Sequence, residues 1–226
     1  QAFGQIVRFL SRDDPSRGVL GVDVGASAVS IAAAFDGELS LTVRPDLGLG
    51  EPLMRVLDHT DVEHIARWLP MEVSEEQVLE YVYNKALNPA TIPAEATDVA
   101  IEHALTREII RPALELARTN WNYGLRGHAP HRGPRADLLP WFEPILASGA
   151  VFAEAPRPGH AALMLLDALQ PTGVTTLVLD RYNLSPVLGA AARLNPTAVV
   201  QILDSGSFVI LGTVITPVGD SRQSRK

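Results

Sequence analysis

The sequence contains no cysteine, so the chain can form neither disulfide bonds nor thiolate metal sites. Aromatic residues make up only 6% of the chain, and its three tryptophans are too scattered to form a platform on which bases could stack. Positive charge is also scarce, because 19 Lys and Arg stand against 26 Asp and Glu. The resulting net charge of −7 argues against a sequence-independent nucleic-acid surface, and we expect no nucleic-acid partner.

Long apolar runs are missing as well. None reaches the roughly 18 residues that a membrane span needs, so we expect no membrane association. The N-terminus has neither the basic region nor the apolar stretch of a secretory signal, which predicts a cytoplasmic protein. Because the chain begins at Gln1 and stops shortly after an expected strand, we expect it to be a piece of a longer protein.

Several catalytic motifs are absent from the sequence. Neither a Gly-x-Ser-x-Gly elbow nor a Walker loop occurs, so acyl transfer and P-loop chemistry have no support. The residues His59, His64 and His103 show no metal-ligand spacing with partner acids. We therefore predict no metal site built from protein ligands alone, and the sequence names no catalytic residue.

Hydrophobic spacing does divide the chain into helices and strands. Residues 45–94 are short helical pieces broken by prolines, with the best helices at 62–68 and 75–85, and we interpret them as a helical insert. Around this insert we expect a helix at 2–10, strands at 18–24, 28–35 and 38–43, a helix at 95–120, a loop at 122–140, a strand at 144–147, a helix at 160–169, a strand at 175–179, a helix at 185–194 and a final pair of segments at 198–203 and 208–213.

This order, β-β-β-α-β-α-β-α with an insert, restricts the fold. Three antiparallel strands followed by two αβ crossovers predict an α/β fold with a mixed five-stranded sheet and helices on both faces. That is the ribonuclease-H-like arrangement, which is also each half of an actin-like ATPase. We expect a leading helix and linker at 1–17, a core at 18–44 and 95–219, the insert subdomain at 45–94 and a tail at 220–226.

A strand-to-turn junction at Asp23-Val24-Gly25 is the first candidate binding feature. A buried strand ends at Gly25, whose missing Cβ permits a tight turn and lets backbone N–H groups approach an anion. Asp23 would then hold a metal or a water beside that anion, with Ser27 close by. An ordinary hairpin is the alternative interpretation.

A second small-residue turn follows a later strand, at Ser148-Gly149-Ala150. Open α/β sheets bind ligands at the carboxyl ends of their strands, so both turns should face one cleft. In the actin-like layout the first turn meets phosphates and the second passes under the adenosine. Asp180 ends the next strand, where it would face the cleft, pair with Arg181 or cap a helix.

Longer segments resemble a known family. The sequence Leu-Asp-Ala-Leu-Gln-Pro-Thr-Gly-Val-Thr-Thr-Leu at 166–177, with Leu-Asp-Arg-Tyr at 179–182, resembles the C-terminal half of the glutamate mutase L family, called MutL and unrelated to the mismatch-repair protein of that name. The segments 83–93, 102–110, 195–196 and 211–219 are similar to it too, so the resemblance covers most of residues 1–219. It implies the actin-like ATPase superfamily and an association with adenosylcobalamin-dependent aminomutases, for which a maintenance or reactivation role has been inferred.

The chain departs from the family where nucleotide chemistry is expected. The family's first turn reads roughly Asp-Val-Gly-Gly-Ala-Thr-Thr-Asp, whereas residues 23–30 here end in Ala-Val-Ser and lack the hydroxyl pair and the second carboxylate. A serine cannot replace a carboxylate as a hard-cation ligand or a water-orienting base at neutral pH. At the next strand end Arg44 replaces an acid, where it would pair with phosphate or with Asp46. A Gly-Gly pair becomes Gly149-Ala150.

Loss of the acid should impair catalysis more than binding. We therefore expect ATP or ADP with Mg to be the ligand, if one is bound, of a degenerate or weakly binding module that acts through protein interaction, with the upstream half of the same protein and a cobalamin-dependent aminomutase as partners. An active chaperone-type ATPase half is the alternative, and a small-molecule kinase ranks last because no catalytic base is evident. The expected contacts are Asp23, Gly25 and Ser27 for phosphate, Ser148, Gly149 and Ala150 for adenosine, and Arg44, Asp46 and Asp180 elsewhere in the cleft.

Overall fold

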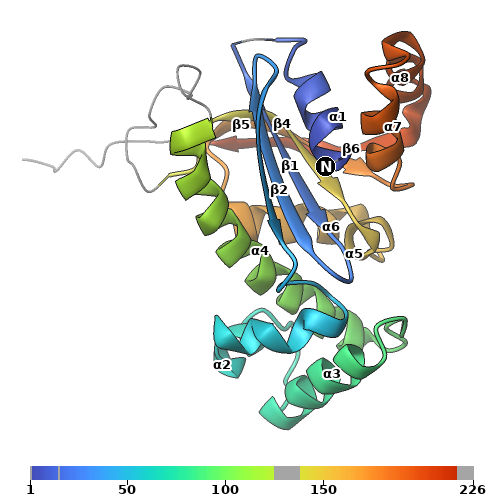
Figure 1. Ribbon diagram of the computed structural model, residues 1–226. Coiled ribbons are helices and arrows are strands. Elements are labelled where there is room, and N and C mark those ends of the chain that lie inside the picture. The colour runs from blue at the N-terminus through green and yellow to red at the C-terminus, as the bar shows by residue number, and fades with distance from the viewer. Residues whose placement is uncertain (1, 15, 125–137, 218–226) are drawn as a thin grey trace, which may run out of the picture.

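Six strands form one mixed sheet in the part of the chain that the structure describes. The computed structural model describes residues 2–14, 16–124 and 138–217, leaving aside the side chains of 122–124. The strand order is β3-β2-β1-β4-β5-β6 (Figure 1). Their bounds are β1 Gly18–Val24, β2 Val29–Phe35, β3 Glu38–Arg44, β4 Phe142–Ser148, β5 Gly173–Asp180 and β6 Phe208–Thr216.

Strand directions follow from the connections. β2 is antiparallel to β1 and β3, while β1, β4 and β5 run parallel to one another. β6 then pairs antiparallel with β5 at the edge of the sheet. Our expectation of five strands is therefore wrong. The additional strand forms because Val209, Leu211 and Val214 pack against the core, while Ile210 and Ile215 stay exposed.

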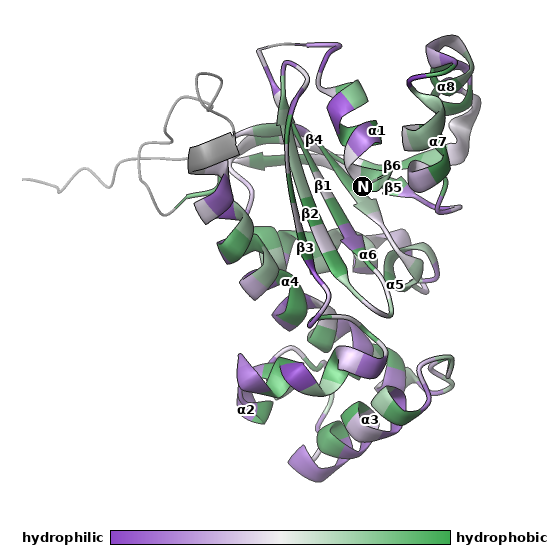
Figure 2. Cartoon of the chain, viewed as in Figure 1, coloured by the Kyte–Doolittle hydropathy of each residue, from purple (hydrophilic) through white to green (hydrophobic). Residues whose placement is uncertain are grey.

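Helices cover both faces of the sheet, as Figure 1 shows. On one face, α4 (Ala96–Gly124) and α6 (Pro158–Leu169) pack on a core that includes Leu20, Val22 and Val24, with the short α5 (Ala150–Ala153) beside them. On the other face, α1 (Ala2–Leu10), α7 (Ser185–Ala191) and α8 (Pro196–Ile202) pack on Val19 and Ala32. Figure 2 shows the strands as largely hydrophobic between these layers. Alternate residues of β1 thus belong to different cores.

Three helices lie between β3 and α4, beyond the end of the sheet in Figure 1. They are η1 (Glu51–Asp58), α2 (Val62–Ala66) and α3 (Glu75–Leu87). α3 begins with a capping box, in which Ser74 and Gln77 satisfy each other's backbone N–H groups. Trp68 follows α2 and donates from Nε1 to Glu108 Oε1 of α4 at 2.7 Å, which ties these helices to the core.

Most element positions agree with the expected ones to within a few residues. β4 is longer than the expected strand at 144–147, and the final pair consists of α8 and β6, joined by the π-helical turn η2 (Leu203–Ser207). Of the expected loop at 122–140, residues 125–137 lie outside the described residues, as does the tail at 220–226. In the described part of the chain, no helix is long and apolar enough to cross a membrane.

Candidate functional site

The carboxyl ends of three neighbouring strands bring Asp23, Ser148 and Asp180 together. Asp23 stands opposite Ser148 in the β1–β4 register, and Asp180 ends β5, the next strand in the sheet. All three side chains point to the face that α1 and α7 cover, since a Cβ at Gly21, two residues before Asp23, would meet Val7 and Phe3 of α1. We call these three residues the strand-end cluster.

Asp23 is the half-buried carboxylate of the cluster. Burial raises its pKa, a hydrogen bond from the Ser148 hydroxyl lowers it, and the nearby Asp180 charge raises it again, with a net increase above the ordinary aspartate value. A carboxylate that is held ionised against this cost gains from a cation or a water placed beside it. Asp23 is therefore the member of the cluster that is suited to ligand chemistry.

Asp180 has a different role. Its side chain is fully buried, and Oδ1 accepts a hydrogen bond from the Leu184 N–H at 2.8 Å while Oδ2 accepts one from the Ser185 N–H at 2.7 Å. Both donors lie at the start of α7, whose first N–H groups have no partner within the helix. Asp180 therefore anchors α7 to the sheet. Of the three roles that the sequence allowed for Asp180, this one is the helix cap.

The turn between β1 and β2 is closed by its own backbone. The Gly25 N–H donates to the Ala28 carbonyl at 3.0 Å, and the Leu49 N–H donates to the Gly25 carbonyl at 3.0 Å. Ala26 and Ser27 are exposed at its tip. Gly48 and Gly50 lie so close to this turn that a Cβ on either would be within 2.8 Å of the Ala26 carbonyl oxygen. These two glycines fix the turn. We did not predict this role from the sequence, although the glycines stand two residues apart in it.

Gly149 joins the second turn to the first. Its φ is 118°, and a Cβ there would lie 2.2 Å from the Val24 carbonyl oxygen, so only glycine fits. Its N–H donates to Asn183 Oδ1 at 3.0 Å, a contact that the sequence did not reveal because 34 residues separate the partners. Ala150 is exposed and begins α5. The two expected turns are thus in direct contact at the end of the sheet.

Arg44 and Asp46 lie away from the strand-end cluster. The Arg44 guanidinium donates from Nε to Asp46 Oδ1 at 2.8 Å and from Nη2 to Asp46 Oδ2 at 2.5 Å, and Nη1 reaches the Pro112 carbonyl of α4 at 3.3 Å. This pairing lowers the pKa of Asp46 to about 2. Arg44 stands beside Val29, which stands beside Val24, so it points to the α4 face, opposite to Asp23. The two residues pair with each other rather than extending the cluster.

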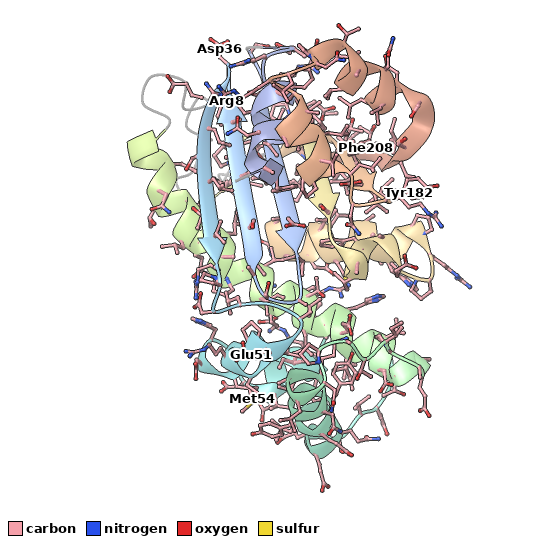
Figure 3. The ribbon with its side chains drawn as sticks, turned by 45° about the vertical axis from the view of Figure 1, so that its right-hand side comes forward. Arg8, Asp36, Glu51, Met54, Tyr182 and Phe208 are labelled. Carbon is pink, nitrogen blue, oxygen red and sulfur yellow. The ribbon has the colours of Figure 1, made fainter. Side chains whose placement is uncertain are left out.

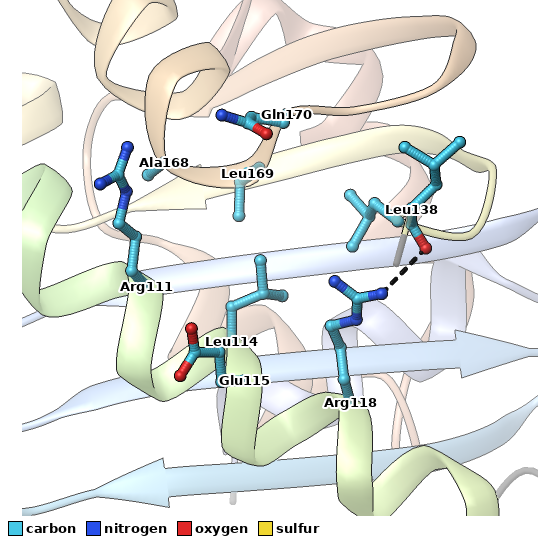
Figure 4. Close-up of a pocket in the computed structure, with 9 residues that line it drawn as sticks. Arg111, Leu114, Glu115, Arg118, Leu138, Ala168, Leu169 and Gln170 are labelled. Atoms are coloured by element: carbon cyan, nitrogen blue, oxygen red, sulfur yellow. Dashed lines mark hydrogen bonds between the residues drawn. The ribbon is translucent and has the colours of Figure 1, made fainter. Parts of the chain in front are cut away.

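A groove on the α4 face contains none of the expected site residues. It has a volume of about 360 Å³ and lies between α4 and the end of α6 (Figure 4). Leu114 and Leu169 form its apolar part, and Arg118 donates to the Leu138 carbonyl at 3.1 Å. Among the described residues, no group of three or more His, Asp or Glu side chains could hold a metal ion.

A family model described as MutL protein matches residues 1–206. The chain belongs to the MutL family. The match spans the strand-end cluster and both turns, and it ends before β6, so it is shorter at the C-terminus than the resemblance that we traced to residue 219. No curated protein matches the chain.

The structure shows where one of the differences between this chain and the MutL-family pattern lies. Ser30, which stands where the family resemblance has its second aspartate, is paired directly with Asp23 across β1 and β2. Its neighbours two and four residues along, Ala32 and Ala34, lie in the α1 core, so Ser30 shares the face of Asp23. A carboxylate at this position would stand next to Asp23. In this MutL-family chain a hydroxyl stands there instead.

Proposed function

We propose that this chain is the C-terminal half of an actin-like ATPase fold that binds nucleotide weakly, does not hydrolyse it by itself and acts through protein interaction. The observation that carries the proposal is that Asp23 alone offers an available carboxylate in the strand-end cluster. Asp23 keeps a carboxylate at the end of the sheet, while Asp180 has both oxygens bonded to α7 and Ser30 supplies no charge. One available carboxylate supports ligand contact better than it supports hydrolysis.

Phosphate contact would fall to the exposed tip of the β1–β2 turn. Ala26 and Ser27 are exposed there, and the Gly25 N–H is already bonded to Ala28. Backbone N–H groups in such a turn form an anion-binding concavity. Gly149, which touches Val24, would bring the second turn and Ser148 beneath the remainder of the nucleotide.

Magnesium fits this site only as a companion of phosphate. Mg²⁺ keeps several waters and is commonly held by one or two carboxylates together with substrate phosphates. Asp23 offers one such carboxylate, whereas the oxygens of Asp180 and Asp46 are engaged with N–H groups and with Arg44. When bound, the ion would neutralise phosphate charge, and Asp23 would hold it or orient a water of its shell.

Protein interaction is the remaining part of the proposal. The partners would be an upstream half of the same protein, as the second wall of the cleft, and a cobalamin-dependent aminomutase, as the client. A half that binds but does not hydrolyse would report nucleotide state to its partner.

An active ATPase is the second candidate, and Asp23 is the observation that favours it. Its raised pKa brings the carboxylate closer to the range in which it can accept a proton from an attacking water. This function needs the further acidic residue to come from the upstream half. The kinase alternative lacks a corresponding observation, since the site offers no additional free carboxylate among the described residues.

Calorimetric titration with ADP, in the presence of Mg²⁺ and then of a chelator, tests the proposal. It should be run on the chain and on the natural protein that contains it, in the wild type and in Asp23→Asn. We expect binding that Mg²⁺ strengthens in the wild type and no longer strengthens in Asp23→Asn.

Asp58→Asn is the matched control, because Asp58 is exposed on η1 and the substitution removes the same charge. No binding by either protein at millimolar nucleotide would overturn the nucleotide proposal. Magnesium-dependent binding that survives in Asp23→Asn would place the ligand elsewhere. Turnover of ATP by the natural protein, lost in Asp23→Asn, would replace the proposal by the active ATPase.

A further inference from the structure

A basic groove lies at the opposite end of the sheet from the strand-end cluster. It has a volume of about 570 Å³ and runs between α1 and the segment that joins α7 to α8. Three arginines line it, Arg8 and Arg12 from the α1 side and Arg193 from the α7 side. The rest of its lining is neutral and consists of Gln5, Phe9, Ala192 and Pro196. In a chain of net charge −7, no carboxylate lines this groove.

The β2–β3 turn holds two of these arginines in place. Arg8 Nε donates to the Gly37 carbonyl at 2.6 Å, and a Cβ at Gly37 would lie 2.8 Å from Arg12 Nε. The absence of a side chain at Gly37 therefore lets both guanidinium groups lie against one turn. Figure 3 shows Arg8 and the neighbouring Asp36 at this end of the molecule, away from Glu51 and Met54 of the inserted helices.

Helices α1 and α7 touch at the start of α1 and separate beyond that point, which leaves the groove between them. A Cβ at Gly189 of α7 would lie 1.9 Å from the Ala2 carbonyl oxygen, so the backbones touch at the start of α1. The groove begins one turn further along α1, at Gln5, and ends at Arg12. Since Gly37 lies beyond the start of β1 and Asp23 lies near its end, about 20 Å of strand separates the Gly37 end of the groove from the strand-end cluster.

Like charges held together in this way repel one another. Arg8 lies in the last turn of α1, Arg12 lies two residues beyond its end, and Arg193 adds a third positive charge from across the groove. Asp36 stands beside Gly37 in the turn, so a carboxylate is present at this end of the molecule (Figure 3), but it does not line the groove. A bound anion would relieve this repulsion, and guanidinium groups bind phosphate oxygens in pairs.

We propose that this groove is a binding site for a small phosphate-bearing molecule. The phosphate would lie between Arg12 and Arg193, with Arg8 behind it, and the uncharged part of the ligand would lie on Phe9 and Pro196. The volume is within the range of small-molecule sites. This site is separate from the proposed nucleotide cleft and does not depend on it.

Pyrophosphate titrated into the chain at low ionic strength tests the assignment. The double variant Arg12→Ala/Arg193→Ala should weaken its binding at least tenfold. Arg157→Ala/Arg181→Ala is the matched control, because it removes two exposed arginines without ion pairs among the described residues, and it should change the affinity less than twofold. Asp23→Asn should leave binding in the groove unchanged, which keeps this test separate from that of the nucleotide site.

Three outcomes would overturn the assignment. The first is no pyrophosphate binding by the wild type up to 10 mM, taken as roughly the limit of useful affinity for so strongly charged a ligand. The second is an equal loss in both double variants, which would reveal general charge attraction. The third is binding of citrate as tightly as pyrophosphate, which would make the groove a carboxylate site.

The unfolding temperature measured without any anion distinguishes a binding role of Arg12 and Arg193 from a structural one. Arginines near the carboxyl ends of α1 and α7 also face the negative ends of the helix dipoles. If repulsion dominates, Arg12→Ala/Arg193→Ala will unfold at the same temperature as the wild type or a higher one. A lower temperature together with unchanged pyrophosphate affinity would assign the arginines to the helix ends and overturn the site.

Discussion

Two aspartates at neighbouring strand ends show how the environment divides one residue type into two roles. Asp180 is fully buried with both oxygens bonded to backbone N–H groups, so its charge stabilises the fold. Asp23 is half-buried, accepts a hydrogen bond from Ser148 and is repelled by Asp180, so its charge is held at a cost. Residues whose charge costs stability without contributing to the fold are frequent at functional sites.

Substitution of these two aspartates should therefore have opposite effects on stability. Because the pKa of Asp23 is raised in the folded state, ionisation at pH 7 opposes folding, and Asp23→Asn should leave the free energy of unfolding unchanged or increase it. Asp180→Ala leaves two buried N–H groups without acceptors and should lower that free energy by about 2–4 kcal/mol. Urea unfolding at pH 7 measures both, and a loss above about 1 kcal/mol in Asp23→Asn, beyond the usual range of a neutral surface substitution, would make Asp23 a structural turn residue.

Gly149 offers a second residue-scale prediction. Gly149→Ala combines a φ of 118° with a Cβ 2.2 Å from the Val24 carbonyl, and we expect it to lower the free energy of unfolding by about 3 kcal/mol or more. Gly159→Ala in α6 is the control, because nothing lies within 4 Å of its Cβ position, and it should be neutral or stabilising by up to about 1 kcal/mol. Equal thermal unfolding of the two variants would contradict the close contact between the two turns.

Helix α4 is the element that connects the parts of the molecule. Trp68 bonds to Glu108 of α4, and the guanidinium groups of Arg67, Arg107 and Arg111 lie 5.1 to 5.5 Å from its ring centre. Nearer the start of the same helix, Glu102 pairs with Lys85 of α3 at 3.3 Å. These contacts hold the inserted helices against α4.

The contact between α4 and α6 should make stability depend on pH. His103 and His160 pack edge to face with ring centres 5.5 Å apart, and burial, with smaller contributions from His160 and Arg107, lowers the pKa of His103 to about 4. Below the unfolded pKa of about 6.5 the unfolded state binds a proton that the folded state does not, so this contribution to stability is lost between pH 6.5 and 4.

The variant His103→Gln isolates this effect from the carboxylates that also titrate in acid. Between pH 7 and 4.5, we expect its free energy of unfolding to fall less than that of the wild type, by about 1–2 kcal/mol after allowance for the partial exposure of the ring. Urea unfolding at the two pH values gives the comparison. Parallel curves for the two proteins would show that the His103 pKa is not lowered in the folded state.

At the scale of the whole molecule, the single available carboxylate predicts the absence of turnover. The chain alone should release phosphate from MgATP no faster than the uncatalysed background. Ser30→Asp places a second carboxylate opposite Asp23, and it should increase Mg²⁺ affinity at least severalfold, because paired carboxylates are better hard-cation ligands. Phosphate release and Mg²⁺ titration check the two parts, and hydrolysis by the unmodified chain that Asp23→Asn abolishes would show that one carboxylate suffices.

Local patterns were enough to place most elements along the chain. The strands expected at 28–35 and 38–43 pair as β2 and β3, and helical spacing placed α1 at the residues where it lies. These signals succeed because hydrophobic periodicity and turn chemistry act between residues that are close in sequence. The segment at 208–213 was expected, but its place as a sixth strand of the sheet was not, since its pairing with β5 depends on the core that Val209 and Leu211 find in three dimensions.

The sequence by itself determined the apolar segment that forms the buried strand β1, the glycine that ends it and the aspartate near that glycine, because each depends on neighbouring residues alone. Only the tertiary structure decided that Asp180 caps α7, that Arg44 turns to the face opposite Asp23, and that Arg8 and Arg12 meet at Gly37. Sequence spacing reports which side of a strand a residue takes, but not which strands become neighbours or which helix covers which face. Those choices are made by the packing of the whole chain.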